Sequence, residues 1–146
     1  LQLMVGHHGC VTSARGQWDR QQALSGCYNN TMQLWDLERG TLIQEFHGHD
    51  GPVQTIEVDW TLRRAVSGSE DGTMRSWSID DQNPETHVLR GHRGRIESMS
   101  VDWDSQHVLS GSRDTTLKLW DLETGTVVRE FWGHLGGVRC VAVKWD

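Results

Sequence analysis

The sequence lacks several features that would assign a function directly. It contains no run of 18 apolar residues, so no membrane-spanning helix is expected. The formal net charge is −6, only two of the 14 basic residues are lysine, and no basic stripe of the kind that binds nucleic-acid phosphates is present. No metal-ligand cluster and no phosphate-binding loop can be identified. Nucleic-acid binding, membrane insertion, a bound metal and any other cofactor are therefore not expected.

Cysteine is scarce and its spacing is irregular. Cys10, Cys27 and Cys140 are odd in number and show no CxxC spacing. This pattern predicts small buried or half-buried residues of a reducing compartment rather than disulfides. We therefore expect an intracellular protein, with the cytoplasm favoured. An organelle stays possible, because a targeting peptide would be invisible if the N-terminus of the sequence is truncated.

What the sequence does have is an internal repeat that starts at each Gly-His pair. From the histidine of each pair, tryptophan follows at +11, serine at +18, aspartate or asparagine at +22 and a second tryptophan at +28. The histidines are 42, 43 and 42 residues apart, a period that indicates a solenoid, a propeller or an array. The landmarks are Trp18, Ser25, Asn29 and Trp35 after His7; Trp60, Ser67, Asp71 and Trp77 after His49; Trp103, Ser110, Asp114 and Trp120 after His92; and Trp145 after His134.

These landmarks resemble the WD-repeat β-propeller family, in which a period of 40 to 45 residues supplies four strands. The resemblance depends on the Gly-His pairs, on Trp35-Asp36 and Trp120-Asp121, and on Ser-Gly-Ser or Ser-Gly-Cys before the +22 position. Two departures are Ser78 after the second tryptophan of one repeat, and Asn29 in place of aspartate.

The resemblance implies an all-β chain of about three complete four-stranded blades with partial blades at both ends. The repeats would cover 6–47, 48–90 and 91–132, with a partial repeat at 133–146. Because propellers typically have 4 to 8 blades, we expect the chain to be part of a larger propeller, with a complete small protein as the alternative.

Strand periodicity supports four strands in each repeat. Alternating or continuous apolar stretches predict strands at 11–14, 53–58, 96–101 and 138–143, and the resemblance implies that these are the innermost strands. Second strands are predicted at 23–27, 65–69 and 108–112, and third strands at 31–35, 73–77 and 116–120. Outer strands are predicted at 41–46 and 126–131, and residues 1–4 are expected on the outer strand of a preceding repeat.

Serine, histidine and aspartate recur together, which suggests a catalytic triad at first sight. An enzyme needs one nucleophile rather than one in each blade, so a structural role is the better interpretation. The resemblance to the WD-repeat family implies a chain of hydrogen bonds. In that chain Asp accepts a hydrogen bond from His, His is hydrogen-bonded to the strand Ser, and Ser is hydrogen-bonded to the Trp indole N–H. Such a chain satisfies buried polar groups that each need a partner. The neutral Asn29 should make the first set the weakest, because a hydrogen bond to a charged group contributes about 1.5 to 3 kcal/mol and a neutral one about 1 kcal/mol.

Two surface features are candidates for partner binding. Trp18, Trp60, Trp103 and Trp145 lie between first and second strands, so all four should lie on one face of the disc. They are either packing seals between blades or anchors for a partner, since tryptophan is enriched at binding hot spots. Arg90, Arg93 and Arg95 flank the Gly91-His92 pair, where they are either solvated charges or ligands for carboxylates.

The sequence therefore predicts a non-catalytic protein–protein interaction scaffold within a larger assembly. The alternative is a purely structural subunit or fragment of a large multi-subunit complex, and an enzyme is the third choice. Other protein chains are the expected partners, and a small-molecule ligand is not expected. Docking to a ubiquitin-ligase adaptor is disfavoured, because the family members that do so carry arginine where this chain has Glu38, Asp80 and Glu123.

Overall fold

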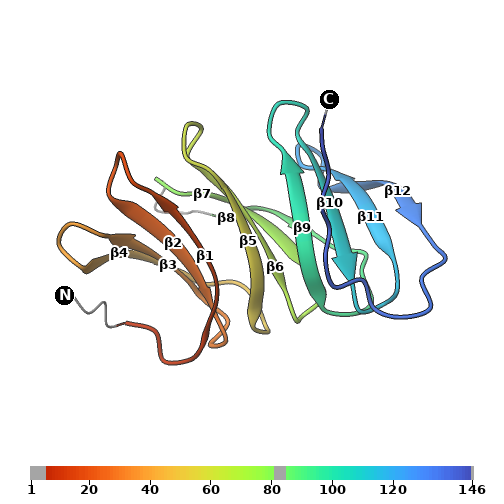
Figure 1. Ribbon diagram of the computed structural model, residues 1–146, viewed down its shortest axis with the longest axis horizontal. Helices are drawn as coiled ribbons and strands as arrows, with labels where there is room; N and C mark the ends of the chain where they lie inside the picture. Colours follow the sequence, from red (N-terminus) through yellow and green to blue (C-terminus); the bar gives the residue numbers. More distant parts are fainter. Residues whose placement is uncertain (1–5, 81–84, 146) are drawn as a thin grey trace.

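The computed structural model describes residues 6–80 and 85–145, and these form twelve strands in three four-stranded antiparallel sheets (Figure 1). We call the sheets blade 1, blade 2 and blade 3. In each blade the strands lie side by side in chain order. Blade 1 contains β1 (Val11–Gln17), β2 (Gln22–Cys27), β3 (Met32–Asp36) and β4 (Thr41–Phe46); blade 2 contains β5 (Val53–Asp59), β6 (Arg64–Ser69), β7 (Met74–Ser78) and β8 (Glu85–Leu89); blade 3 contains β9 (Ile96–Asp102), β10 (His107–Ser112), β11 (Leu117–Asp121) and β12 (Thr126–Phe131).

The all-β fold predicted from the repeat is confirmed, and most predicted strands agree with the structure within one residue at each end. The outer strands at 41–46 and 126–131 agree at both ends. The inner strand of blade 1 is longer than predicted, because it pairs with β2 as far as Gln17. The strand expected at 1–4 lies outside the described residues.

One predicted strand is wrong. Residues 138–143 form no strand, although they lie against blade 3. The backbone N–H of Val138 donates to the carbonyl oxygen of Ser112 at 2.8 Å, and that of Val141 donates to Ser98 Oγ at 3.2 Å. In the three blades the innermost strand pairs with the strand that follows it, whereas no described strand pairs with residues 138–143.

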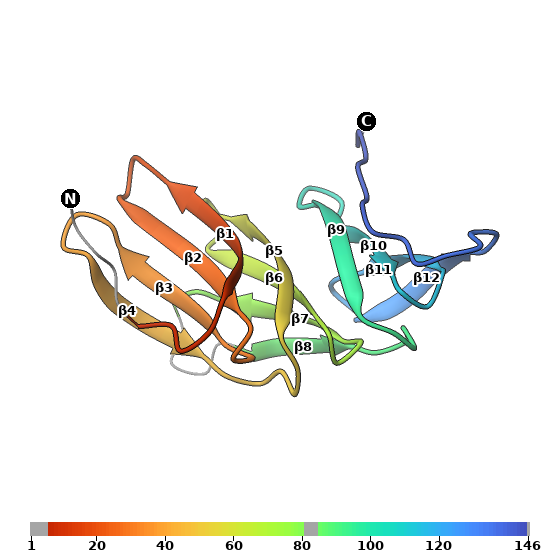
Figure 2. The same ribbon diagram turned by 60° about the horizontal axis from the view of Figure 1, so that its bottom comes forward.

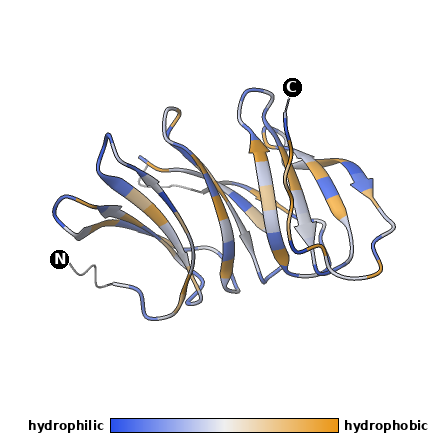
Figure 3. Ribbon diagram, viewed as in Figure 1, coloured by the Kyte–Doolittle hydropathy of each residue, from blue (hydrophilic) through white to orange (hydrophobic). Residues whose placement is uncertain are grey.

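The blades pack face to face through their apolar side chains. Strand β5 lies between β1 and β9, so the innermost strands of the three blades are neighbours (Figure 2). The apolar residues concentrate on the strands rather than on the turns (Figure 3). One buried cluster fills the interface of blades 1 and 2, with Leu24, Met32, Leu34, Phe46, Val53, Ile56, Ala65, Trp77 and Ile79. A second fills the interface of blades 2 and 3, with Val66, Met74, Leu89, Ile96, Met99, Val108, Trp120 and Leu122.

The glycine of each Ser-Gly pair allows the next blade to approach closely. A Cβ atom on Gly68 would lie 2.6 Å from Ile96 Cγ2, at the start of β9. Gly26 meets Val53 and Gly111 meets Val138 in the same way, each at 2.7 Å from a valine Cγ1. Val138 therefore contacts blade 3 in the same way as Val53, the first residue of β5, contacts blade 1. A β-branched side chain over a glycine is therefore the repeated contact between blades.

We predict that Gly68→Ala destabilises the chain by about 1 to 3 kcal/mol, the usual cost of overpacking a close contact. The added methyl group would also lie 2.9 Å from Thr55 Cγ2, so neither neighbour leaves room for it. Urea unfolding followed by tryptophan fluorescence measures the effect. Gly136→Ala is the matched control, since a Cβ there meets nothing within 4 Å. Equal midpoints for the two variants would show that the close approach does not limit stability.

Candidate functional site

The recurring polar residues of blade 2 form a continuous hydrogen-bonded chain. His49 Nδ1 lies 2.9 Å from Asp71 Oδ2, and His49 Nε2 lies 2.7 Å from Ser67 Oγ. The indole Nε1–H of Trp77 donates to the same Ser67 Oγ at 2.8 Å. Because a carboxylate can only accept, Nδ1 carries the imidazole proton, and Nε2 accepts from the serine hydroxyl.

Blade 3 repeats this chain with almost the same distances. His92 Nδ1 lies 2.7 Å from Asp114 Oδ2, His92 Nε2 lies 2.8 Å from Ser110 Oγ, and Trp120 Nε1 donates to Ser110 Oγ at 2.8 Å. Ser67 and Ser110 are both 0% exposed. No substrate can reach a hydroxyl group that is enclosed in this way. The geometry therefore suits a structural link between the entry loop, the second strand and the third strand better than nucleophilic catalysis.

Each of these hydrogen-bonded chains has a fifth member, a threonine, that was not predicted from the sequence. Thr73 Oγ1 donates to Asp71 Oδ1 at 2.6 Å, and Thr116 Oγ1 donates to Asp114 Oδ1 at 2.7 Å. The backbone N–H of each threonine donates to the same carboxylate oxygen. A signal for this role was present, because threonine recurs at +24 in all three repeats, with Thr31 as the third example.

Burial and hydrogen bonding act in opposite directions on the acidic groups of these chains. Burial alone would raise the pKa of Asp71, but hydrogen bonds from His49 and Thr73 hold that pKa well below its usual range. The pKa of Asp114 is lowered in the same way, against burial, by Thr116, the Arg93 backbone and His92. Both carboxylates are therefore ionised at neutral pH and fully used as acceptors.

Blade 1 departs from this pattern at its asparagine. His7 Nε2 lies 2.6 Å from Ser25 Oγ, and Trp35 Nε1 donates to Ser25 Oγ at 2.8 Å. Asn29 Oδ1 accepts from Thr31 Oγ1 at 2.9 Å, so the other polar atom of the amide is Nδ2, which can only donate. Among the described residues, His7 Nδ1 is buried without a hydrogen-bond partner. The expected link between His7 and the +22 residue is therefore not formed, and burial lowers the pKa of His7.

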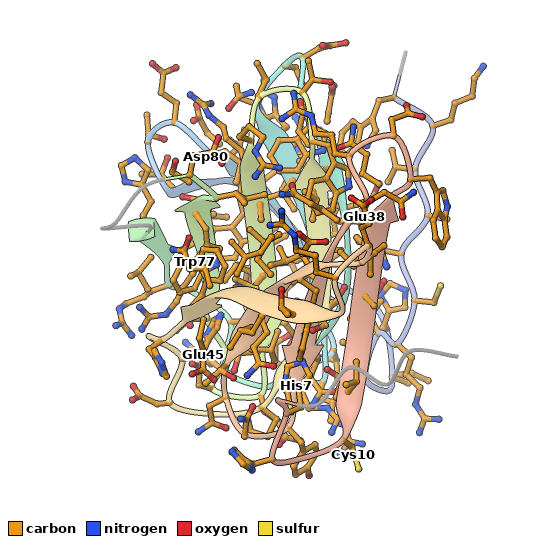
Figure 4. The ribbon with its side chains drawn as sticks, turned by 90° about the vertical axis from the view of Figure 1, so that its left-hand side faces the viewer. His7, Cys10, Glu38, Glu45, Trp77 and Asp80 are labelled. Carbon is orange, nitrogen blue, oxygen red and sulfur yellow. The ribbon has the colours of Figure 1, made fainter. Side chains whose placement is uncertain are left out.

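The two ends of the sheets carry different groups. Viewed from the blade 1 side, His7 and Cys10 lie toward one end and Glu38 and Asp80 toward the other, with Trp77 between them (Figure 4). The β1–β2, β5–β6 and β9–β10 turns lie together at one end (Figure 1). Trp18, Trp60 and Trp103 come from these turns, so they share one end of the molecule.

The environments of the four repeat tryptophans nevertheless differ. Trp60 is half-buried against the cluster between blades 1 and 2, and Trp103 is half-buried against the cluster between blades 2 and 3. Each packs at the interface with the preceding blade. Trp18 is 75% exposed, because no described blade precedes blade 1. Trp145 is half-buried, and its Nε1 donates to Ser100 Oγ at 3.2 Å. The packing contacts of Trp60 and Trp103 favour the seal interpretation for those two residues.

The three candidate arginines also differ. Arg95 Nη1 lies 2.6 Å from Glu70 Oε1, and Arg95 Nη2 lies 2.9 Å from Glu97 Oε2. Glu97 and Glu70 raise the pKa of Arg95, so this side chain is held within a fixed charge cluster that the sequence analysis missed. Arg90 and Arg93 are exposed, and their side chains have no ion pair with any residue that the structure describes.

All three cysteines are free; Cys27 is buried as predicted, but Cys10 and Cys140 are exposed, so that part of the prediction is wrong. Both lie outside the described strands. Within the described ranges, no group of three or more His, Cys, Asp or Glu side chains could hold a metal ion. No helix in the same residues is long and apolar enough to cross a membrane.

Comparison with known proteins agrees with this geometry. The sequence matches the family model described as "WD domain, G-beta repeat" three times, at residues 1–36, 40–78 and 83–121. A search of curated protein sequences finds no match.

Several solved structures are similar to the chain. A chain in the crystal structure of a mitotic checkpoint complex has a TM-score of 0.84 at 21% identity, over 94% of this chain and 42% of that one. The computationally designed Ika4 protein has a TM-score of 0.85 at 29% identity, over 99% of this chain and 86% of that one. The crystal structure of the RRP9 WD40 repeats has a TM-score of 0.84 at 18% identity, over 94% of this chain and 43% of that one. The chain thus spans less than half of the first and third structures.

We predict that Asn29→Asp stabilises the chain by about 1 to 2 kcal/mol, since it supplies an anionic acceptor for the buried His7 Nδ1. Asp114→Asn should have the opposite effect in blade 3. The gain from Asn29→Asp should grow as the pH falls from 7 to 5. A nearby carboxylate raises the folded-state pKa of His7, so protonation then costs the folded state less.

Denaturant unfolding at several pH values measures these differences. Asn29→Ala separates the new acceptor from the loss of the turn contact with Thr31. If Asn29→Asp were no more stable than the unmodified chain at both pH values, the unpaired imidazole nitrogen would not be a source of instability.

The tryptophans give a further prediction. Trp60→Ser should lower the free energy of unfolding by roughly 2 kcal/mol, because its ring packs against a buried cluster. Trp18→Ser should change it by less than about 0.5 kcal/mol, as is usual for an exposed position. Thermal unfolding of both variants tests the contrast. A large loss for Trp18→Ser would mean that its ring has a packing role in solution.

Proposed function

The chain belongs to the WD domain, G-beta repeat family, and we propose that it acts as a non-catalytic protein–protein interaction scaffold within a larger assembly. One observation carries this proposal: the recurring His, Ser and Asp side chains bond to one another inside blades 2 and 3, whereas other large or charged side chains stand free at the blade ends. Arg90, Arg93 and Trp18 are exposed examples.

A rigid sheet scaffold suits this function. Each blade holds its loops at fixed positions through the buried chain of hydrogen bonds and through contacts with its neighbours. Binding then costs little ordering entropy, so short exposed loops can provide affinity. The similar chain from a mitotic checkpoint complex was itself crystallised as part of an assembly, which supports the same role for this chain.

The surface chemistry supports protein partners in a reducing compartment. Arg90 and Arg93 stand beside the Gly91-His92 loop, where guanidinium groups suit carboxylates of a partner. The formal net charge of −6 disfavours nucleic acid as the partner. Three free cysteines support an intracellular location, and the cytoplasm remains the favoured compartment.

The second candidate function is a purely structural subunit or fragment that fills a place in a large complex. The exposed Trp18 supports it, because an uncovered tryptophan at the repeat position where Trp60 and Trp103 pack against a preceding blade suits permanent burial by another chain. The two functions differ in reversibility. A structural subunit would remain in one stable complex at all salt concentrations, whereas a scaffold would exchange partners.

We predict that Arg90→Glu with Arg93→Glu reduces partner recovery at least tenfold without changing the melting temperature. The tagged chain is purified from cell extract, and co-purifying proteins are quantified at low and at high salt. Arg20→Glu is the control, since Arg20 is exposed in the turn between β1 and β2 of blade 1, away from this loop (Figure 1).

Unchanged recovery for the double variant would exclude this arginine surface as the binding site. A salt-resistant set of co-purifying proteins, insensitive to either change, would favour the structural subunit instead.

A further inference from the structure

The interface of blades 2 and 3 contains a pocket of about 390 Å³. Its walls include Arg64, Ser76 and His87 from blade 2 and Trp103 and Glu123 from blade 3. The pocket opens at the end of the sheets that carries the tryptophan turns. Its volume falls within the range of about 300 to 1,000 Å³ that is typical of binding sites.

The repeat shows why the pocket forms at this interface. Ser76 pairs with His87 in blade 2 just as Leu34 pairs with Gln44 in blade 1. Leu34 is 2% exposed and belongs to the cluster that fills the interface of blades 1 and 2. Blade 3 also has leucine here, at Leu119. Ser76 is therefore the exception, and it leaves open the space that a leucine side chain would fill.

A second exception opens the mouth of the pocket. At the interface of blades 1 and 2, the Arg63 guanidinium lies over the Trp60 ring at 5.7 Å, pairs with Asp80 at 2.8 Å and donates to Gln22 at 3.0 Å. This arginine side chain is only 14% exposed, so it closes that interface. The equivalent residue in blade 3 is Gln106, whose side chain is shorter and turns back to the carbonyl oxygen of Trp103.

Because Gln106 stands where blade 2 has Arg63, two opposite charges at the mouth of the pocket are left without a charged partner among the described residues. Glu123 occupies the position of Asp80, but in the part of the chain that the structure describes no cation pairs with it. Arg64 donates to Gln106 Oε1 at 3.2 Å and has no carboxylate partner among the same residues. Both side chains are exposed. A ligand that carries complementary charges on either side of an apolar group would satisfy both.

We infer that this pocket receives one apolar side chain, of leucine or phenylalanine size, from an extended segment of a partner protein. An acidic residue of the segment pairs with Arg64 and a basic residue pairs with Glu123. Trp103 provides an aromatic wall, and the charged mouth shields the inserted side chain from water, as at typical binding hot spots. The inference depends on the proposed scaffold function, since it names the site and the chemistry of one partner.

The test uses short capped peptides as probes. Glu-Phe-Lys and Lys-Phe-Glu, both acetylated and amidated, cover the two chain directions, and Gln-Phe-Gln and Glu-Ala-Lys are the neutral and small-side-chain controls. Binding is followed by the NMR signal of the Trp103 indole N–H, with the Trp60 signal as an internal control. We expect one charged phenylalanine peptide to shift the Trp103 signal alone, and the alanine peptide to bind at least fivefold more weakly.

Substitutions in the pocket make the test specific. Ser76→Leu should fill the space and abolish the Trp103 response, whereas Ser76→Ala, which leaves the space open, should retain it. Arg64→Gln and Glu123→Gln change only exposed groups, so they should fold normally, weaken the charged peptide severalfold and leave the neutral one unchanged.

Equal responses of Trp60 and Trp103, unchanged binding to Ser76→Leu, or no response to any peptide would overturn the inference. These outcomes leave the scaffold function itself intact, because partner recovery through Arg90 and Arg93 is measured separately.

Discussion

The structure depends on satisfying a serine hydroxyl that is buried inside each blade. Ser67 in blade 2 and Ser110 in blade 3 each accept an indole N–H and bond to an imidazole, which is held in turn by a carboxylate. One buried atom thus links the loop before the innermost strand to the second and third strands. Because an unpaired buried polar group costs about 1 to 3 kcal/mol, the members of each chain depend on one another. These residues are therefore committed to holding the blade together.

The contacts between blades depend instead on the size of the side chains at the interface. A β-branched side chain at the start of blades 2 and 3 lies over the glycine of the preceding blade, as Ile96 lies over Gly68. This contact fixes how closely two blades can approach, and the leucine and tryptophan positions must then fill the remaining space. Where they do so, as at the interface of blades 1 and 2, the cluster is continuous. Where Ser76 and Gln106 replace the larger side chains, the same close approach leaves a pocket.

The repeat spacing was enough to predict most of the strands and four of the five members of the polar chains in blades 2 and 3, because both depend on local order and a fixed period. It could not predict burial that depends on a neighbouring blade. Trp18, Trp60 and Trp103 occupy the same position in the repeat, yet among the described residues only the last two have a preceding blade to pack against. The sequence left open whether Arg95 is a solvated charge or a carboxylate ligand, because one of its two partners, Glu70, comes from another blade. The strand expected at 138–143 failed for a related reason, since a ladder needs a second strand.

Residues that depart from the repeat pattern have two different physical consequences. The difference indicates which departures could form a binding site. In blade 1, Asn29 replaces aspartate, and among the described residues the buried His7 Nδ1 has no hydrogen-bond partner. That exception weakens the blade and offers nothing to a ligand, because the atom is enclosed. At the interface of blades 2 and 3, the exceptions instead open a volume to solvent and expose complementary charges beside an aromatic ring. Only this second kind of exception can be satisfied by another molecule, so the pocket is the stronger candidate for a partner-binding site.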